Sequence, residues 1–213
     1  KPPVITILDG STEDLSVKNA INFHYNGTAE TQAESIKLEY LVSAKNEKTG
    51  ISLGSTTAEK LTATKIDETS YSWSFDLDKD KIADIVNEEI GLYTYTVTIR
   101  AINGDDGQIT EISRRVYLDT EKPAPRISSI VPQITANSKE NNVNGIITVA
   151  GNITDNYTLK NTVYNLYIDG QAVDTSKGNF GESTTYSFTV DTTKYENKKD
   201  LLIEVVTTDV AGN

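Results

Sequence analysis

The stretch VYLDTEKPAP, residues 116–125, divides the sequence into two parts and decides how each part is interpreted. Val116 and Leu118 continue an alternation of apolar and other residues that is typical of a strand. The polar residues that follow lead to Pro123 and Pro125. Proline has no backbone N–H group and pushes the residue before it toward an extended conformation, so a central strand cannot continue through these positions. We interpret the stretch as a short, stiff, charged connector that ends one β-domain and begins the next.

Alternation of apolar and polar residues predicts several short strands before this connector. The clearest run is YSWSFDL, residues 71–77, in which Tyr71, Trp73, Phe75 and Leu77 fall on one face. Further strands are predicted at residues 4–8, 20–25, 36–44, 92–101 and 112–118. Short strands separated by turn residues, without a long helix, indicate a β-sandwich.

One segment of the first part has a helical rather than a strand pattern. In DKIADIVNEE, residues 80–89, Ile82 and Ile85 recur at helical spacing. Asp78 or Asp80 would lie near the helix N-terminus, where a carboxylate can accept backbone N–H groups. We therefore expect about two turns of helix, inserted before the penultimate strand of the first domain.

The second part repeats the order of the first, which indicates two copies of one unit. YSFTVD, residues 186–191, matches YSWSFD, residues 71–76, in its pattern. Further strands of the second part are predicted at residues 145–154, 162–168 and 201–207. We expect two domains, residues 1–120 and residues 121–213.

The second domain is expected to lack its last strand. In the first domain a closing strand follows the strand of residues 92–101, whereas the second domain stops just after the counterpart of that strand. Either the chain has been cut there, which we favour, or another molecule adds a strand to the open edge. Because the sequence contains no methionine and no visible signal peptide, we expect a monomeric fragment of a longer chain, internal or processed.

Three phrases of the sequence resemble the tandem immunoglobulin-like domains of bacterial surface and secreted proteins, the Big-type domains. TTDVAGN, residues 207–213, is similar to the Asp-x-Ala-Gly-Asn end of a late strand, and LDTEKPAP, residues 118–125, to the junction between domains. VYNLYIDGQAV, residues 163–173, resembles the middle strand and turn. In the first domain, residues 102–107 depart from the Ala-Gly-Asn phrase. The resemblance implies an all-β fold of two tandem immunoglobulin-like β-sandwich domains.

Composition excludes several kinds of partner. The chain has 31 Asp and Glu residues against 20 Lys and Arg, a net charge of -11. Phosphate binding needs clustered Lys and Arg, so nucleic acids and anionic membranes are excluded as partners. No apolar run approaches the ~18 residues needed to cross a bilayer, so we expect no membrane insertion. Cysteine is absent, which excludes disulfides and thiolate metal sites.

The acidic residues predict one candidate metal site. Calcium requires several carboxylate and carbonyl oxygens that converge on one point, and the junction of two tandem sandwiches would bring loops and linker together. The predicted ligands of this interdomain calcium are Asp78, Asp80, Asp119, Glu121, Asp155 and Asp209. The alternative is that these acids are ordinary solvated loop residues and helix caps. No other cofactor is expected.

No group in the sequence has the setting of a catalytic residue, so we expect no enzyme. The single histidine, His24, is predicted to face outward from its strand. The adjacent acid pairs, Glu88 with Glu89 and Asp105 with Asp106, cannot flank a scissile bond as glycosidase carboxylates do.

The resemblance implies a non-catalytic extracellular or cell-surface module, a stalk, a spacer or an adhesion-type domain, in a larger bacterial protein. One alternative is a module that binds a surface glycan or a host or cell-wall protein. Another is a pair of ancillary domains of a secreted carbohydrate-active enzyme. Sugar binding favours exposed aromatic side chains, and the candidates are Tyr157, Tyr167 and Tyr195, since Trp73 is predicted to face the core.

Overall fold

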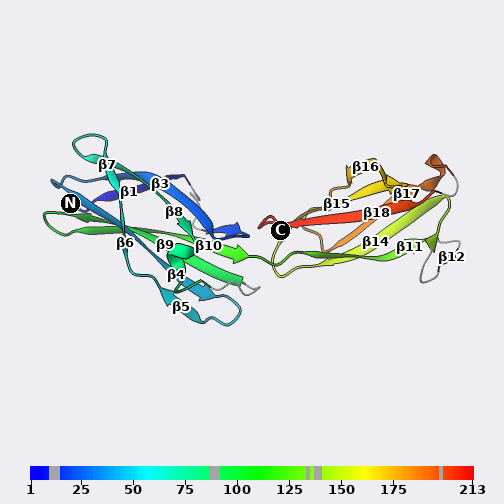
Figure 1. Ribbon diagram of the computed structural model, residues 1–213, viewed down its shortest axis with the longest axis horizontal. Helices are drawn as coiled ribbons and strands as arrows, with labels where there is room; N and C mark the ends of the chain where they lie inside the picture. The colour runs from blue at the N-terminus through cyan, green and yellow to red at the C-terminus, as the bar shows by residue number, and fades with distance from the viewer. Residues whose placement is uncertain (10–14, 87–91, 133–134, 137–140, 197–198) are drawn as a thin grey trace. The chain divides into compact units, whose positions relative to one another are not determined.

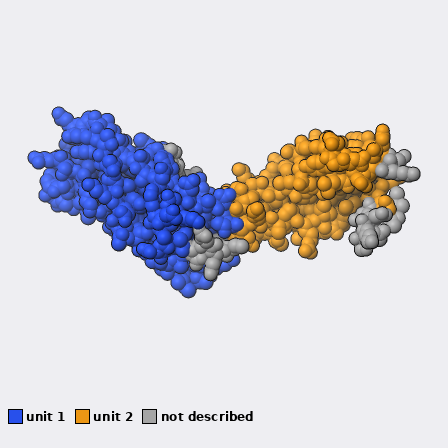
Figure 2. Space-filling model, in the orientation of Figure 1, with its two compact units in different colours: residues 1–120 blue, residues 121–213 orange. Residues whose placement is uncertain are grey.

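The computed structural model describes residues 1–9, 15–86, 92–132, 135–136, 141–196 and 199–213. These residues form two compact units, unit 1 (Lys1–Thr120) and unit 2 (Glu121–Asn213), shown in blue and orange in Figure 2. Both units consist of strands with short turns, so the predicted all-β class is confirmed (Figure 1).

Unit 1 contains two facing sheets. The order of the first sheet is β1 (Val4–Asp9), β3 (Asn22–Glu30), β8 (Ser70–Asp78) and β7 (Ala63–Lys65). The order of the second sheet is β2 (Leu15–Lys18), β10 (Ile109–Asp119), β9 (Leu92–Asn103), β4 (Ile36–Asn46) and β5 (Ser52–Ser55), with β6 (Glu59–Leu61) also paired to β4. The pairing of β2 with β10 is parallel, and the other pairings are antiparallel.

The core of unit 1 follows the predicted alternation. In β8, Tyr71, Trp73 and Leu77 are buried, while Phe75 is half-buried and stacks on Tyr40 with ring centroids 4.4 Å apart. The inward side chains of β4 and β9 complete the same apolar cluster. Each sheet therefore buries one face against the other, as the period of two requires.

The predicted helix is wrong. Only Asp80–Ile82 forms a helical turn, the 3-10 helix η1, and residues 87–91 lie outside the described part of the chain. The Oδ1 atom of Asp78 accepts the backbone N–H groups of Asp80 and Lys81 at 3.1 Å each, as a helix-capping carboxylate does. Ile82 and Ile85 are buried, so the apolar spacing was correctly recognised. A segment this short cannot offset the cost of helix nucleation. A single turn is also enough to bring both isoleucines into the core.

Unit 2 has a smaller pair of sheets. The first sheet has the order β11 (Ala124–Val131), β14 (Ile146–Thr154) and β17 (Thr185–Asp191). The second has the order β16 (Gln171–Lys177), β15 (Leu159–Ile168) and β18 (Leu201–Asp209). A two-stranded ribbon of β12 (Thr135–Ala136) and β13 (Asn141–Asn142) and the 3-10 turn η2 (Thr192–Lys194) complete the described elements. The core of unit 2 is formed by residues of unit 2 alone.

A glycine in the second strand of the first sheet marks the two units as copies of one design. Gly27 lies opposite Trp73, and Gly151 lies opposite Tyr186. At either glycine a Cβ atom would collide with the opposite aromatic ring and with a backbone carbonyl of the neighbouring strand. Tyr186 therefore occupies the position of Trp73, two residues from the Tyr71 to which the sequence pattern matched it.

Candidate functional site

Two of the predicted calcium ligands form an acid pair inside unit 2. Asp155 directly follows β14, and Asp209 is the last residue of β18. Carboxylate oxygens of these two residues lie within 4.8 Å of one another. Asp209 is completely buried and Asp155 is half-buried. The antiparallel pairing of β15 with β18 brings the end of β18 beside Leu159, the first residue of β15, and so close to the preceding loop.

The phrase DVAGN has a structural role around this pair. The Oδ1 atom of Asp209 accepts the backbone N–H groups of Gly212 at 2.7 Å and Asn213 at 2.8 Å, and its Oδ2 atom accepts the side-chain amide of Asn213 at 2.9 Å. Gly212 has φ +95°, a conformation that favours glycine. The aspartate therefore holds a tight turn, and its oxygens keep further lone pairs for another ligand.

Unit 1 has neutral side chains in the equivalent places. Thr31 follows β3 as Asp155 follows β14, and Asn103 ends β9 as Asp209 ends β18. The Thr31 hydroxyl donates to the Asn103 side-chain oxygen at 2.6 Å, and the Asn103 amide donates to the Lys1 carbonyl at 3.0 Å. This pair satisfies itself, whereas two ionised carboxylates repel each other unless a cation or a proton lies between them. Hard oxygen ligands of this kind suit calcium.

The remaining predicted ligands have varied surroundings. Asp78 caps η1, as described above, and Asp80 is exposed within that turn. Asp119 is completely buried at the end of β10, and Glu121 is half-buried at the start of unit 2. That these four acids join Asp155 and Asp209 around one ion stays a prediction.

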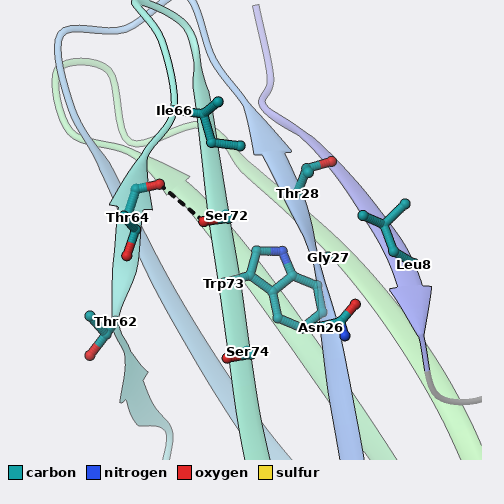
Figure 3. Close-up of a pocket in the computed structure, with 10 residues that line it drawn as sticks. All are labelled: Leu8, Asn26, Gly27, Thr28, Thr62, Thr64, Ile66, Ser72, Trp73 and Ser74. Atoms are coloured by element: carbon teal, nitrogen blue, oxygen red, sulfur yellow. Dashed lines mark hydrogen bonds between the residues drawn. The ribbon is translucent and has the colours of Figure 1, made fainter.

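A second candidate site lies on the outer face of the β1-β3-β8-β7 sheet, within unit 1. This hollow has a volume of about 500 Å³, and Figure 3 shows the residues that line it. It is lined by Leu8, Asn26, Gly27, Thr28, Thr62, Thr64, Ile66, Ser72, Trp73 and Ser74. None of these residues has an ionisable side chain. Trp73 is almost fully buried, and its ring packs against Gly27 on the core side of the sheet.

Register across the strands produces the polar lining. Thr28 of β3 lies opposite Ser72 of β8, which lies opposite Thr64 of β7, so three hydroxyl side chains form one row. Asn26 and Ser74 form the next row. The Ser72 hydroxyl donates to the Thr64 carbonyl at 3.4 Å (Figure 3). Neighbouring strands are about 4.8 Å apart, so these side chains present a regular array of groups that both donate and accept hydrogen bonds.

Apolar side chains stand at two edges of the hollow. Leu8 of β1 and Ile66, between β7 and β8, lie on different sides of the polar rows (Figure 3). Leu8 is 62% exposed and Ile66 is 58% exposed. This site was not predicted from the sequence, because the outward residues of a strand are usually a solvated face. The available signal was that the outward residues from Ser72 to Ser74 and from Asn26 to Thr28 are all uncharged.

Of the three aromatic candidates for sugar binding, Tyr157 is exposed and the other two are not. Tyr157 is 37% exposed, whereas Tyr167 and Tyr195 are half-buried. A hydrogen bond from the Tyr167 hydroxyl to Glu204, 3.1 Å long, raises the pKa of Tyr167. Tyr195 packs against the core of unit 2, and burial raises its pKa.

His24 is an exposed residue, as predicted. Its Nδ1 atom lies 2.6 Å from Oδ1 of Asp76, directly opposite on β8. A cross-strand pair between two exposed side chains is a common feature of sheets and contributes little to stability.

The described part of the chain also has no helix with the length and apolar character required to span a membrane.

Comparison with known proteins finds similar solved structures at low sequence identity. No protein-family model matches the sequence, and neither does any curated protein. The fibronectin(III)-like modules of CbhA from Clostridium thermocellum match 98% of this chain and 88% of their own, with 14% identity and a TM-score of 0.39. The chicken CNTN1 FN1-FN3 domains match 99% of this chain and 64% of theirs, with 14% identity and a TM-score of 0.40.

A third similar structure is a Ca2+-stabilized adhesin with which an Antarctic bacterium binds ice. It matches 98% of this chain and 48% of its own length, with 12% identity and a TM-score of 0.39. The two pairs of sheets described above, rather than these similarities, define the chain as two β-sandwich units. Likeness at this level does not bear on function.

Proposed function

We propose that this chain is a non-catalytic spacer of a larger extracellular bacterial protein, in which the two units hold other domains at a distance. The observation that carries the proposal is that each unit has its own core. All buried apolar residues of one cluster belong to unit 1, and all those of the other belong to unit 2. Each unit can then act as a separate rigid segment.

The connector supports the same function. Only residues 120–123 separate the end of β10 from the start of β11. Pro123 lies in this connector, and Pro125 is the second residue of β11. Proline restricts the backbone at and before its own position, so the connector has fewer accessible conformations than a glycine-rich linker of equal length.

A distance measurement tests the spacer proposal. The chain has no cysteine, so spin labels can be attached at two introduced cysteines, Lys60→Cys in unit 1 and Lys160→Cys in unit 2, both at exposed positions. Pulsed electron resonance is expected to give one narrow distance distribution. Replacing both Pro123 and Pro125 with glycine is expected to broaden it, while the melting temperatures of both units change little. An equally broad distribution in the parent chain would refute the spacer proposal.

We also propose that calcium binds at the acid pair of unit 2. The proposal is supported by the proximity of Asp155 and Asp209 and by the neutral pair, Thr31 and Asn103, that stands in the same places of unit 1. A bound divalent cation would remove the repulsion between the two carboxylates and tie β18 to the loop after β14.

A further inference from the structure

We propose that the hollow on the outer face of unit 1 binds a neutral oligosaccharide. The proposal goes beyond the spacer function, which the distance measurement tests separately. It commits to one ligand chemistry: an uncharged chain with many hydroxyl groups and apolar C–H faces.

The absence of charge in the lining is the first argument. Charged residues make up 24% of the chain, so ten residues taken at random would include about two, whereas the ten that line the hollow include none. With a net charge of -11, the protein as a whole repels acidic ligands. The lining itself offers no anion to a basic ligand. The hollow therefore favours a neutral ligand.

The polar groups of the lining are also of the chemical type that a glycan presents. Thr28, Ser72 and Thr64 present hydroxyls in one row, and Asn26 and Ser74 add an amide and a hydroxyl in the next. A hydroxyl can donate one hydrogen bond and accept two, as a sugar hydroxyl can. Side-chain hydroxyls and sugar hydroxyls can therefore hydrogen-bond in many relative orientations. This suits a glycan, which carries hydroxyl groups along its whole length.

The position of the hollow argues against a peptide ligand. Peptides that bind β-sandwiches usually add a strand at a sheet edge, where unpaired backbone N–H and C=O groups are available. The centre of the hollow lies over β3 and β8, which are interior strands paired on both sides, and its margins reach the edge strands β1 and β7. Over β3 and β8 the backbone groups are already used in the ladder, so recognition there must come from side chains.

The apolar edges supply the remaining contacts. Leu8 and Ile66 are the two largest exposed apolar side chains of the lining, and they lie on different sides of the polar rows (Figure 3). Aliphatic side chains can pack against the C–H face of a sugar ring while the hydroxyls pair below. A volume of about 500 Å³ also falls within the range of about 300–1,000 Å³ that is typical of small-ligand sites.

Titration with defined glycans tests the proposal. The probes are cellohexaose, xylohexaose and mannohexaose, with an oligogalacturonate of equal length as the acidic comparison. We expect at least one neutral hexamer to shift the backbone amide signals of residues 26–28 and 72–74 in nuclear magnetic resonance spectra. The fluorescence of Trp73, the only tryptophan, gives a second readout because this residue is among those that line the hollow.

A matched pair of double variants localises the binding. Thr28→Val with Ser72→Ala removes two facing hydroxyls of the hollow and is expected to weaken binding about tenfold, which corresponds to about 1.4 kcal/mol. Thr98→Val with Ser113→Ala removes the facing hydroxyls of β9 and β10, which are 2.9 Å apart outside the hollow, and is expected to leave binding unchanged. Thermal melts verify that both variants fold.

Three results would overturn the proposal. The first is that no neutral hexamer perturbs these signals at millimolar concentration. The second is that both double variants weaken binding equally. The third is that the oligogalacturonate binds as tightly as the best neutral hexamer.

Discussion

The inward side chains of β9 in unit 1 are buried, whereas the matching side chains of β18 in unit 2 are half-exposed. Ile99 of β9 is 1% exposed, but Ile203 and Val205 of β18 are only partly buried against their core. In unit 1, β9 lies between β4 and β10. Among the described residues of unit 2, β18 pairs with β15 alone.

The facing edge of the other sheet differs in the same way. Ile7 of β1 is 7% exposed, whereas Ile127 at the equivalent place in β11 is 36% exposed. In unit 1, Val116 and Leu118 of β10 fill the space between these edges and are buried. In unit 1, β10 therefore completes the burial of β9 and β1. We therefore expect unit 1 to be the more stable unit, because more apolar area is removed from water.

Replacing the same residue type in both strands gives the largest expected effect. Ile99→Ala is expected to lower the free energy of unfolding of unit 1 by about 3–4 kcal/mol, because it leaves a cavity in a closed core. Ile203→Ala is expected to cost about half as much, because its side chain is already partly hydrated. Urea denaturation measures both, with Trp73 fluorescence reporting on unit 1 and circular dichroism on both units. Equal losses would contradict the comparison.

A substitution at the equivalent glycines is expected to affect both units alike. Gly27→Ala and Gly151→Ala each place a Cβ atom against the backbone carbonyl of Thr6 or Arg126, which cannot turn away as a side chain can. We expect a loss of about 3 kcal/mol in each unit. Thr64→Ala, at an exposed position of the same sheet as Gly27, serves as the control, with little expected change. A tolerated alanine at only one of the glycines would show that the two units are built differently there.

Calcium is expected to stabilise unit 2 and to leave unit 1 unchanged. At about a hundred times its dissociation constant, an ion that binds only the folded state adds about 2.7 kcal/mol, which a thermal melt with calcium or with EDTA detects. Asp155→Thr with Asp209→Asn copies the neutral pair of unit 1 and is expected to abolish the calcium response.

A separate variant tests the connector acid. Asp119→Asn is expected to weaken the response if this residue is a ligand, and an unchanged response would assign the ion to the acid pair alone. A parent melt that does not respond to calcium at all would leave the acids of unit 2 as turn-forming groups.

The smallest expected effect concerns a tyrosine of unit 1 at high pH. Burial raises the pKa of Tyr25 from 10.0 to about 12, and the charge of Arg114 opposes part of this shift. The folded state favours the neutral phenol. Its contribution to folding stability is therefore fully present below pH 10 and is lost as the pH rises to about 12. The parent chain should therefore lose about 2 kcal/mol of its free energy of unfolding at high pH through this group, and Tyr25→Phe is expected to remove that loss. Denaturation at about pH 9 and about pH 11.5 measures this, and equal pH dependence of variant and parent would contradict it.

Much of the fold could be predicted because its signals are local. The alternation in residues 71–77 predicted which side chains of β8 face the core, and only Phe75 is less buried than expected. The helix could not be predicted, since the apolar spacing of Ile82 and Ile85 is the same for one turn as for two, and packing decided the length. Asp209 was recognised through its turn phrase, which is also local.

The hollow could not be predicted, because it depends on register. No sequence pattern links the three hydroxyl residues Thr28, Thr64 and Ser72. Only the pairing of β3, β8 and β7 places them in one row. The same is true of Asp155 and Asp209, whose proximity needs the pairing of β15 with β18. Local patterns predict strands and turns, whereas sites built across strands require the pairing itself.

The glycines at positions 27 and 151 have a consequence for how the chain avoids incorrect structures. A strand that slips by one residue exposes its apolar face, but a slip by two keeps the same residues inward and is harder to reject. A slip by two residues would replace Gly27 or Gly151 with a residue that has a Cβ atom, and this atom would collide with the aromatic ring and the carbonyl that lie against the glycine. Each glycine therefore disfavours a misaligned pairing that the hydrophobic pattern alone would allow, and each unit has one such glycine.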